Sequence, residues 1–305
     1  IEKFLRKLSE DLYKISIQDL LNTITKQVYD NIPMSEVNQI ILNSTKEKIE
    51  NHYEYSQLSA RIKLHEMYES ILEKSHKDSD FTKTYQEKFK IYIQKGIELE
   101  LLTEEFNTFN LDKIISEIKP ERDFLFHYLG IQILSDRYFI KNRNNSQIEL
   151  PQWFWLRIAM GLSLKEENKE EKAIEFYTVL SKMDLISSTP TLFNSGTRFS
   201  QMSSCYLNVT EDSLESIFKL YSDNAKLSKW AGGIGSDWSY VRATGSQIKG
   251  TNGASQGIIP FIKIFNDVAL AVNQGGKRKG AMCAYLELWH YDVEQFFELR
   301  KNTGD

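Results

Sequence analysis

Apolar side chains recur every three or four residues through the first 185 positions of the chain, with charged residues between them. Phe4, Leu5 and Leu8 begin this pattern, which is typical of helices that bury one face. We therefore predict a mostly helical region. Residues 1–75 are expected to form a small helical bundle, and residues 76–185 a second helical domain that is rich in aromatic side chains.

Individual residues indicate where several of these helices begin and end. Ser16 and Ser35 are predicted N-caps, because a serine before an apolar run can bind the first free amides of a helix. Gly96 is predicted to stop the helix that precedes it. Pro151 is expected to open a helix that carries Trp153, and we interpret this tryptophan as part of a hydrophobic core.

Beyond residue 185 the pattern changes to short apolar runs separated by glycines. The predicted order is strand, strand, helix, strand, helix, strand and helix, and such alternation is typical of a mainly parallel sheet or barrel. Asp212 and Glu215, at the start of the first of these helices, have the spacing of a capping box. We place the seven elements at residues 186–193, 202–209, 213–230, 238–243, 257–272, 281–286 and 293–300.

Composition narrows the class of protein. Of 305 residues, 41% are hydrophobic and 26% charged, which is typical of a soluble globular protein. The net charge of −4 gives no argument for nucleic-acid binding, and no apolar run reaches the roughly 20 residues that a membrane span requires. Two cysteines, Cys205 and Cys283, favour a reducing cytoplasm over a disulfide framework. The chain begins at Ile1 without methionine, and we expect a processed, truncated or split product.

Glycines mark the region where function is expected. Of the 15 glycines, 12 lie at or after Gly196, and they gather in three loops, where backbone can turn sharply or approach a ligand. The loop at 275–280 carries three consecutive cations, which favour an anionic ligand, although a solvated basic turn is the alternative. It lacks the Gly-Lys-Ser/Thr ending of a P-loop, and Trp238 occupies the third glycine position of a dinucleotide motif. The five histidines show no metal-ligand spacing with the cysteines.

Seven short motifs then occur in order. They are Thr-Pro-Thr-Leu-Phe-Asn-Ser-Gly-Thr at 189–197, Ser-Ser-Cys-Tyr-Leu at 203–207, Ala-Gly-Gly-Ile-Gly at 231–235, Arg-Ala-Thr-Gly-Ser at 242–246, Gly-Thr-Asn-Gly at 250–253, Asn-Gln-Gly-Gly-Lys-Arg-Lys-Gly-Ala at 273–281 and Tyr-Leu-Glu-Leu-Trp-His at 285–290. Together they closely resemble the large (alpha) subunit of class I ribonucleotide reductase of the bacterial type. The resemblance is dense from about residue 150 onward and weaker but continuous upstream.

The resemblance implies a fold and an activity. Members of this family reduce ribonucleotides to deoxyribonucleotides by thiyl-radical chemistry inside a ten-stranded α/β barrel. We therefore expect an α/β protein with a mostly helical N-terminal region, followed over residues 186–305 by the first part of that barrel. Residues 1–75 resemble the later helices of the family's regulatory ATP-cone, whose opening hairpin has no counterpart in this sequence.

The resemblance also implies roles for single residues. Cys205 matches the first cysteine of the pair that reduces the substrate, and thiol–disulfide exchange can restore such a pair. Cys283 matches no redox position, and we interpret it as structural. The matched substrate-binding residues are Thr189, Ser204, Gly233 and Arg278, of which Thr189 and Ser204 are diphosphate-binding hydroxyls. The matched residues of the allosteric effector site are Asp212, Ser213, Leu214, Arg242, Lys249 and Gln274, and the loop at 245–257 matches the one that folds over the effector.

The remaining expectations concern cofactors and partners. The radical cysteine, the second reducing cysteine and the radical-transfer tyrosines have no counterpart here, so we do not expect activity from this chain alone. Implied partners are the remainder of the large subunit, a small beta subunit that carries the metal–radical cofactor, thioredoxin or glutaredoxin, and a second copy bound through the effector site. No metal is expected in this chain, and the effector would be a deoxynucleoside triphosphate or ATP. Two alternatives are a non-catalytic split fragment that binds deoxynucleotides and dimerises, and an unrelated α/β domain.

Overall fold

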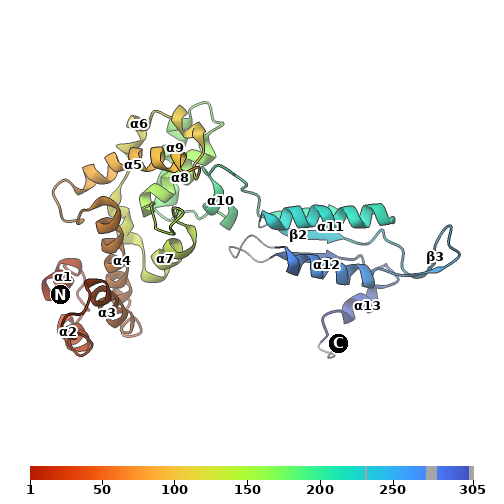
Figure 1. The fold of residues 1–305 in the computed structure, drawn as a ribbon, viewed down its shortest axis with the longest axis horizontal. Helices are drawn as coiled ribbons and strands as arrows, with labels where there is room; N and C mark the ends of the chain where they lie inside the picture. Colours follow the sequence, from red (N-terminus) through yellow and green to blue (C-terminus); the bar gives the residue numbers. More distant parts are fainter. Residues whose placement is uncertain (231, 273–279, 302–305) are drawn as a thin grey trace. The chain divides into compact units, whose positions relative to one another are not determined.

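The computed structural model describes residues 1–230, 232–272 and 280–301 (Figure 1). These residues form two compact units. The helical unit comprises residues 1–187 and 191–200, and the sheet unit comprises residues 188–190 and the described residues from 201 onward. The predicted fold class is confirmed, because a mostly helical region precedes a parallel sheet covered by helices. None of the helices described is long and apolar enough to cross a membrane.

The helical unit is built from α-helices joined by short turns. Two 3-10 helices, η1 (Glu104–Thr108) and η2 (Pro120–Leu125), and a π-helical turn, η3 (Leu134–Tyr138), lie between them. The α-helices are α1 (Glu2–Leu8), α2 (Ile17–Thr25), α3 (Met34–Lys46), α4 (Glu54–Leu72), α5 (Phe81–Glu98), α6 (Leu111–Ile115), α7 (Tyr128–Ile133), α8 (Pro151–Ser163), α9 (Lys169–Ser181) and α10 (Thr189–Asn194), the last of which continues from the sheet unit.

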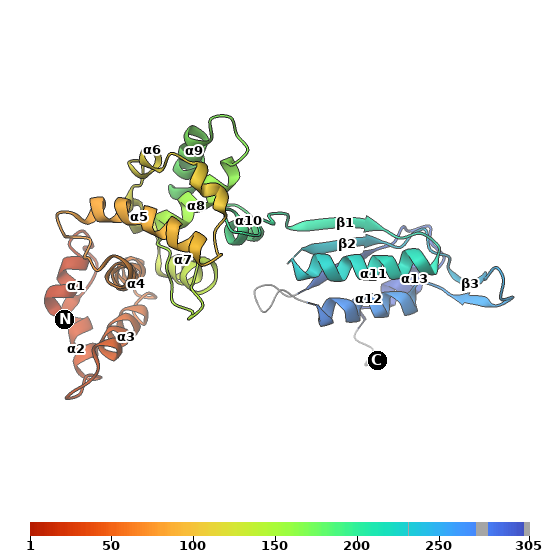
Figure 2. The same cartoon turned by 45° about the horizontal axis from the view of Figure 1, so that its top comes forward.

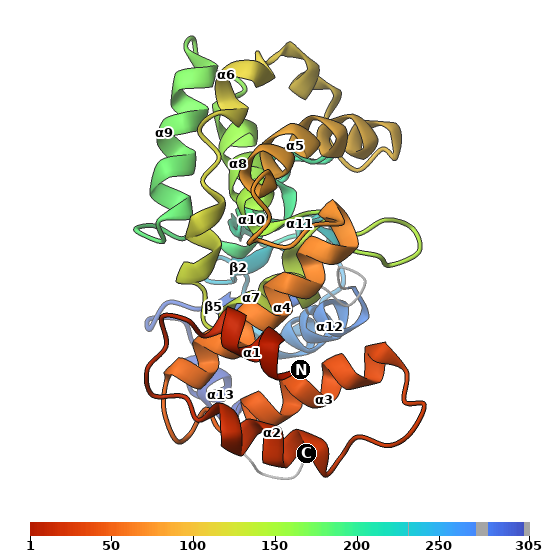
Figure 3. The ribbon, with the colours of Figure 1, turned by 90° about the vertical axis from the view of Figure 1, so that its left-hand side faces the viewer.

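The first four helices form a bundle around buried leucines and isoleucines (Figure 3). Ser16 caps α2 as predicted, since its hydroxyl accepts a hydrogen bond from the amide of Asp19. The predicted cap at Ser35 is wrong, because Pro33 already occupies the N-cap position and α3 begins one residue later. Helix α4 contributes residues to this bundle and also to the next core, so the boundary predicted at residue 75 stays a prediction.

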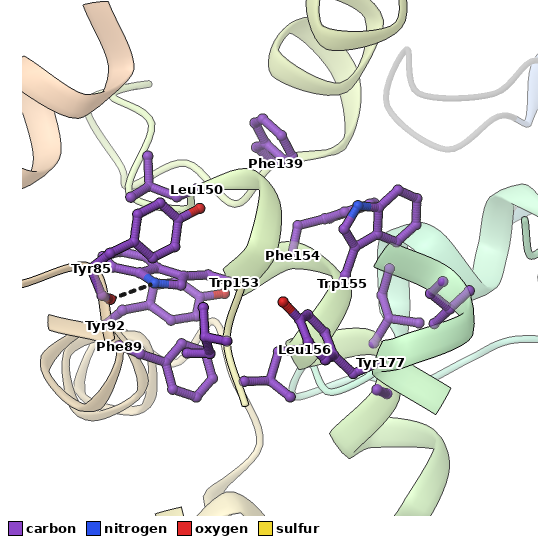
Figure 4. Packing of buried hydrophobic residues seen from close by; sticks show 14 of the residues in the cluster. Tyr85, Phe89, Tyr92, Phe139, Leu150, Trp153, Phe154, Trp155, Leu156 and Tyr177 are labelled. Atoms are coloured by element: carbon purple, nitrogen blue, oxygen red, sulfur yellow. Dashed lines mark hydrogen bonds between the residues drawn. The ribbon is translucent and has the colours of Figure 1, made fainter. Parts of the chain in front are cut away.

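Helix α8 lies at the centre of the second core (Figure 4). All of its residues except Leu162 are buried or nearly so. The Trp153 ring stacks on Tyr92 with ring centroids 5.3 Å apart, and its indole N–H donates to the carbonyl of Tyr85 at 3.1 Å. The interpretation of Trp153 as a core residue is therefore confirmed, and Pro151 opens the helix as predicted.

Gly96 does not stop a helix. Helix α5 continues through it to Glu98, and the glycine is buried. A Cβ atom at this position would collide with the side chain of Leu102, which packs directly against the helix backbone. The glycine therefore serves close packing, a role that its position in the sequence did not indicate.

The sheet unit contains a three-stranded parallel sheet in the order β1-β2-β5, with a separate two-stranded hairpin, β3-β4. Helices α11 and α12 cover one face of the parallel sheet (Figure 2). The elements are β1 (Cys205–Val209), α11 (Leu214–Lys229), β2 (Gly233–Asp237), β3 (Thr244–Gln247), β4 (Ala254–Gln256), α12 (Ile259–Ala271), β5 (Ala281–Tyr285) and α13 (Val293–Glu298).

Two predicted strands are wrong. The strand predicted at 186–193 is absent, because residues 186–188 have no regular structure and Thr189–Asn194 form helix α10. Pro190 occupies the first turn of this helix, where a missing amide hydrogen costs nothing. Residues 238–243 form a turn, and the strand lies just before them in β2. Glycines in β2 allow close neighbours, because a Cβ atom at Gly235 would collide with side chains of both flanking strands.

Candidate functional site

Ser204, Cys205 and Gly233 lie together at the start of the parallel sheet. Cys205 begins β1 and is the register partner of Gly233, which begins β2. The amide of Gly233 donates to the carbonyl of Ser204 at 2.8 Å, and the Ser204 hydroxyl lies 3.7 Å from the Cys205 sulfur. The structure thus brings together three residues that the sequence assigned to catalysis and substrate binding.

The thiol of Cys205 is exposed on the face of the sheet opposite α11 and α12. Asn208, which points to the other face, donates to Asn224 of α11 at 2.7 Å and so identifies the helix-covered side. Since strand side chains alternate between faces, Cys205 and Leu207 point away from the helices. Among the described residues the Cys205 sulfur is therefore accessible to a reactant.

Cys283 lies on the same open face but cannot reach Cys205. Gly235 of β2 pairs with Leu207 on one side and with Cys283 on the other, so the two cysteines are two strands and two residues apart. Standard strand spacings put their Cα atoms on the order of 12 Å apart, beyond the roughly 7 Å that a disulfide can span. Cys283 is exposed, so packing inside the core does not account for it.

A cavity of about 190 Å³ lies at the other end of the sheet, where β1 has ended. Three of the predicted effector residues line it, and a fourth, Arg242, closes one side. Two further lining residues, Ile248 and Ser255, lie in the loop at 245–257 that was predicted to fold over the effector. Sequence reasoning missed Ile217, Val241 and Phe261, because single apolar positions in separate segments carry no local signal. The full lining is Asp212, Ser213, Leu214, Ile217, Val241, Arg242, Ile248, Ser255 and Phe261.

Asp212 and Arg242 form an ion pair at this cavity, in which one nitrogen of the guanidinium contacts both carboxylate oxygens. The Arg242 Nε lies 2.9 Å from one carboxylate oxygen and 2.8 Å from the other, and the Arg242 amide also donates to Asp212 at 3.1 Å. Partial burial raises the pKa of Asp212, but the hydrogen bonds and charge of Arg242, with the charge of Lys249, outweigh it and hold the pKa below its usual value. A charged acceptor and a guanidinium fork therefore lie together at the cavity wall.

The N-terminus of α11 also faces this cavity. Ser213 is the N-cap, and its hydroxyl accepts from the amide of Ser216 at 3.1 Å. The predicted capping box of Asp212 and Glu215 is wrong, because Asp212 is engaged with Arg242 instead. Free amides and the helix dipole at such a terminus favour anionic groups.

The other predicted site residues do not line this cavity or lie outside the described residues. Lys249 is exposed in the β3-β4 hairpin and does not line the cavity, although its charge acts on Asp212. Thr189 begins helix α10. Gln274 and Arg278 lie outside the described residues.

A second cavity, of about 420 Å³, lies among the N-terminal helices. Its lining is mostly apolar and includes His65 and two glutamates, Glu66 and Glu69, with no lysine or arginine among the described residues. Burial raises the pKa of Glu66. This lining offers no lysine or arginine side chain to a triphosphate. Over the described residues, no group of three or more His, Cys, Asp or Glu side chains is arranged to hold a metal ion.

Comparison with protein families gives two matches that follow one another along the chain. Residues 124–200 match the family described as "Ribonucleotide reductase, all-alpha domain". Residues 203–305 match the family described as "Ribonucleotide reductase, barrel domain". The junction lies just before β1.

Curated relatives from distant organisms are named as the alpha or large subunit of ribonucleoside-diphosphate reductase. The chain is 52% identical over 277 residues to the ribonucleoside-diphosphate reductase subunit alpha of Chlamydia muridarum, covering 91% of this chain and 26% of the relative. It is 44% identical to the Helicobacter pylori subunit alpha over 308 residues, covering 100% of this chain and 38% of that protein. The Arabidopsis thaliana large subunit is 37% identical, with 98% and 36% covered. The chain thus spans between a quarter and two fifths of the length of these relatives.

Proposed function

Since the chain belongs to the ribonucleotide reductase large-subunit family, we propose that it supplies the N-terminal part of a ribonucleoside-diphosphate reductase. In this proposal it contributes one redox cysteine, part of the substrate phosphate site and the allosteric specificity site. One observation carries it: a single sheet holds Ser204, Cys205 and Gly233 at one end and the cavity with Asp212 and Arg242 at the other. The two ends of β1 are roughly 13 Å apart.

Cys205 would act as one of two thiols that reduce the substrate. Together the two thiols give up two protons and two electrons, and their sulfurs join in a disulfide. One proton leaves with the substrate hydroxyl as water, and the other proton and the two electrons form the C–H bond that replaces the broken C–O bond. The open face at Cys205 supports this role, because a second cysteine needs access to its sulfur. Ser204 and Thr189 would donate hydrogen bonds to the substrate diphosphate. Thioredoxin or glutaredoxin would restore the thiols, and a small beta subunit would carry the metal–radical cofactor.

The cavity near Arg242 would bind a deoxynucleoside triphosphate or ATP. Apolar walls from Ile217, Ile248 and Phe261 suit a base, Asp212 suits a sugar hydroxyl, and Arg242 with the α11 N-terminus suits phosphates. Gln274 and Arg278 would relay the identity of the bound effector to the substrate site.

A second copy of the subunit would dock beside the effector site. Large apolar side chains of α11 and α12 are exposed among the described residues, and such exposure is typical of an interface. Leu214 is 61% exposed and also lines the cavity, so a partner copy there would be coupled to effector binding. The other exposed side chains are Phe218, Ile264 and Leu270.

The experiment is turnover of a complete subunit that carries this sequence, assayed with a small subunit and thioredoxin. We expect Cys205→Ser to abolish multiple turnover of ribonucleoside diphosphate, with folding unchanged because the substitution is small. Cys283→Ser is the matched control, since it lies on the same face of the sheet and should retain activity. Wild-type turnover by Cys205→Ser with a dithiol reductant would show that the redox assignment is wrong.

The alternative is a non-catalytic fragment that binds deoxynucleotides and dimerises. It is favoured by the effector cavity, to which this chain contributes nine lining residues. Both readings expect the isolated chain to be inactive in reduction. The two hypotheses differ when the rest of the subunit is supplied. Only the reductase hypothesis then predicts that deoxyribonucleotide is formed.

A further inference from the structure

The hairpin that borders the effector cavity is held at both ends by one buried carboxylate. Asp292 lies before α13 and is only 2% exposed. Its carboxylate accepts from the amide of Thr244, where the hairpin starts, at 2.9 Å. It also accepts from the amide of Ile258, just past the end of the hairpin, at 3.2 Å. The two amides are 14 residues apart in the chain and share one acceptor group.

His290 fixes the carboxylate in turn. Its Nδ1 accepts a hydrogen bond from the amide of Asp292 at 3.1 Å, so in the neutral ring Nε2 carries the proton. Nε2 then donates to the carbonyl of Val241 at 2.7 Å. His290 is 4% exposed, and Val241 immediately precedes Arg242. Asp292 and His290 therefore bind the segment before the hairpin as well as both ends of the hairpin.

The hairpin that these two residues hold contributes to the cavity. Ile248 and Ser255, both within the hairpin region, line it. The Arg242 Nη1 donates to the carbonyl of Gln247 at 3.2 Å, so the position of the hairpin also determines where the guanidinium points. Gly257 leaves space for the carboxylate, since a Cβ atom there would collide with Asp292 Oδ2.

From these contacts we propose that Asp292 and His290 form a clasp that positions the hairpin and Arg242 for nucleotide binding. The clasp consists of the Asp292 carboxylate, the His290 ring and the three backbone groups that they bind. Asp292 is a positioning residue: it does not line the cavity and acts through Thr244, Ile258 and the hairpin between them. This role rests on the proposed effector site.

Closing both ends of a loop with one buried anion has a clear physical effect. Hydrogen bonds to a charged acceptor are stronger than those between neutral groups. Because the site is buried, a backbone amide that lost this carboxylate would find no water to bind in its place. A hairpin released at its base would sample many orientations, and a ligand would then have to order it on binding. With the clasp in place, that ordering is complete before the ligand arrives.

The test uses hydrogen exchange and deoxythymidine triphosphate binding on the same protein. Asp292→Ala should speed exchange across residues 244–258 by at least about tenfold, and it should weaken binding by about tenfold. Exchange in the middle of α11 should stay unchanged, which shows that the unit is still folded. Glu294→Ala is the matched control, because this exposed carboxylate lies two residues further along and contacts no part of the hairpin among the described residues.

Asp292→Asn provides a second variant if the alanine variant fails to fold. Its amide oxygen can still accept from both backbone amides, as one Asp292 oxygen does here, but it carries no charge, so the hydrogen bonds weaken and we expect an intermediate effect. Unchanged exchange in the hairpin, or faster exchange with undiminished binding, would overturn the clasp. If the wild-type protein bound no triphosphate, the proposed effector site would be wrong. The exchange data would still test whether Asp292 holds the hairpin.

Discussion

The guanidinium of Arg157 and the carboxylate of Glu149 form an ion pair at 2.6 Å, with both side chains fully buried. Arg157 also donates to the carbonyls of Ser195 at 2.6 Å and Leu192 at 3.2 Å. These bonds attach the end of α10 and the residues after it to the central helix α8. Because Tyr92 donates to the same carboxylate, the buried charges have a full set of partners.

Removing either side chain of the Arg157–Glu149 pair should therefore destabilise the protein strongly. We expect Arg157→Met to lower the free energy of unfolding by about 3–5 kcal/mol, since Glu149 would remain buried without its counter-charge. Arg198→Met is the control, because it breaks an exposed pair with Glu100 and should change stability little. Urea denaturation followed by tryptophan fluorescence makes the comparison. Similar midpoints for the two variants would show that the buried pair is not needed for stability.

Asp123 should make stability depend on pH. Burial raises its pKa to about 7, although hydrogen bonds from Gln152, Tyr68 and Tyr85 oppose the shift. The unfolded pKa is roughly 3.9, so the folded state favours the proton. The contribution of Asp123 to the free energy of unfolding is fully present below about pH 4 and is lost as pH rises through about 7. We expect the wild-type protein to lose stability relative to Asp123→Asn between pH 5 and 8. Parallel stabilities over that range would contradict the assignment.

Arg242 should dominate triphosphate affinity. Arg242→Ala removes a charge-assisted contact of about 1.5–3 kcal/mol, so calorimetry should show binding weakened on the order of tenfold to a hundredfold. Arg278→Ala should matter less, because the resemblance gives that residue a relay role. Equal losses, or a larger loss at Arg278, would mean that we have exchanged the roles of the two loops.

Three glycines of the hairpin region can be ranked. Gly257 has a φ of +72° and no room for a Cβ atom, Gly245 has a φ of +84° with open space, and Gly253 has neither constraint. An alanine in the left-handed region costs roughly 1–2 kcal/mol before any collision. We expect the loss of thermal stability to be largest for Gly257→Ala, smaller for Gly245→Ala and near zero for Gly253→Ala. Any other order in melting experiments would argue against the close contact with Asp292.

Local chemistry made several elements predictable. Ser16 and Pro151 act at helix starts as their types suggest, and the alternation of strands and helices indicated a parallel sheet. The resemblance anticipated the grouping of Cys205 with Gly233. Some failures depended on distant contacts: the residues of α10 were predicted as a strand, yet Arg157 of α8 binds the carbonyl of Leu192 in α10.

The clasp was missed for the same reason. Asp292 lies 48 residues from Thr244 and 34 residues from Ile258, and one acidic residue in an otherwise ordinary segment carries no local signal. The cavity lining was equally hidden, since Val241 and Phe261 look like any other apolar residues until the fold brings them together.

The open face of the parallel sheet has a practical consequence for anyone who produces this polypeptide. Leu207 is 81% exposed and Tyr285 51% exposed, and both lie on outer strands that have a hydrogen-bonded neighbour on one side only within the described residues. Unpaired strand edges next to apolar side chains promote self-association in solution. We expect the purified chain to precipitate at high concentration and to stay dispersed when a charged residue replaces Leu207, which light scattering can follow.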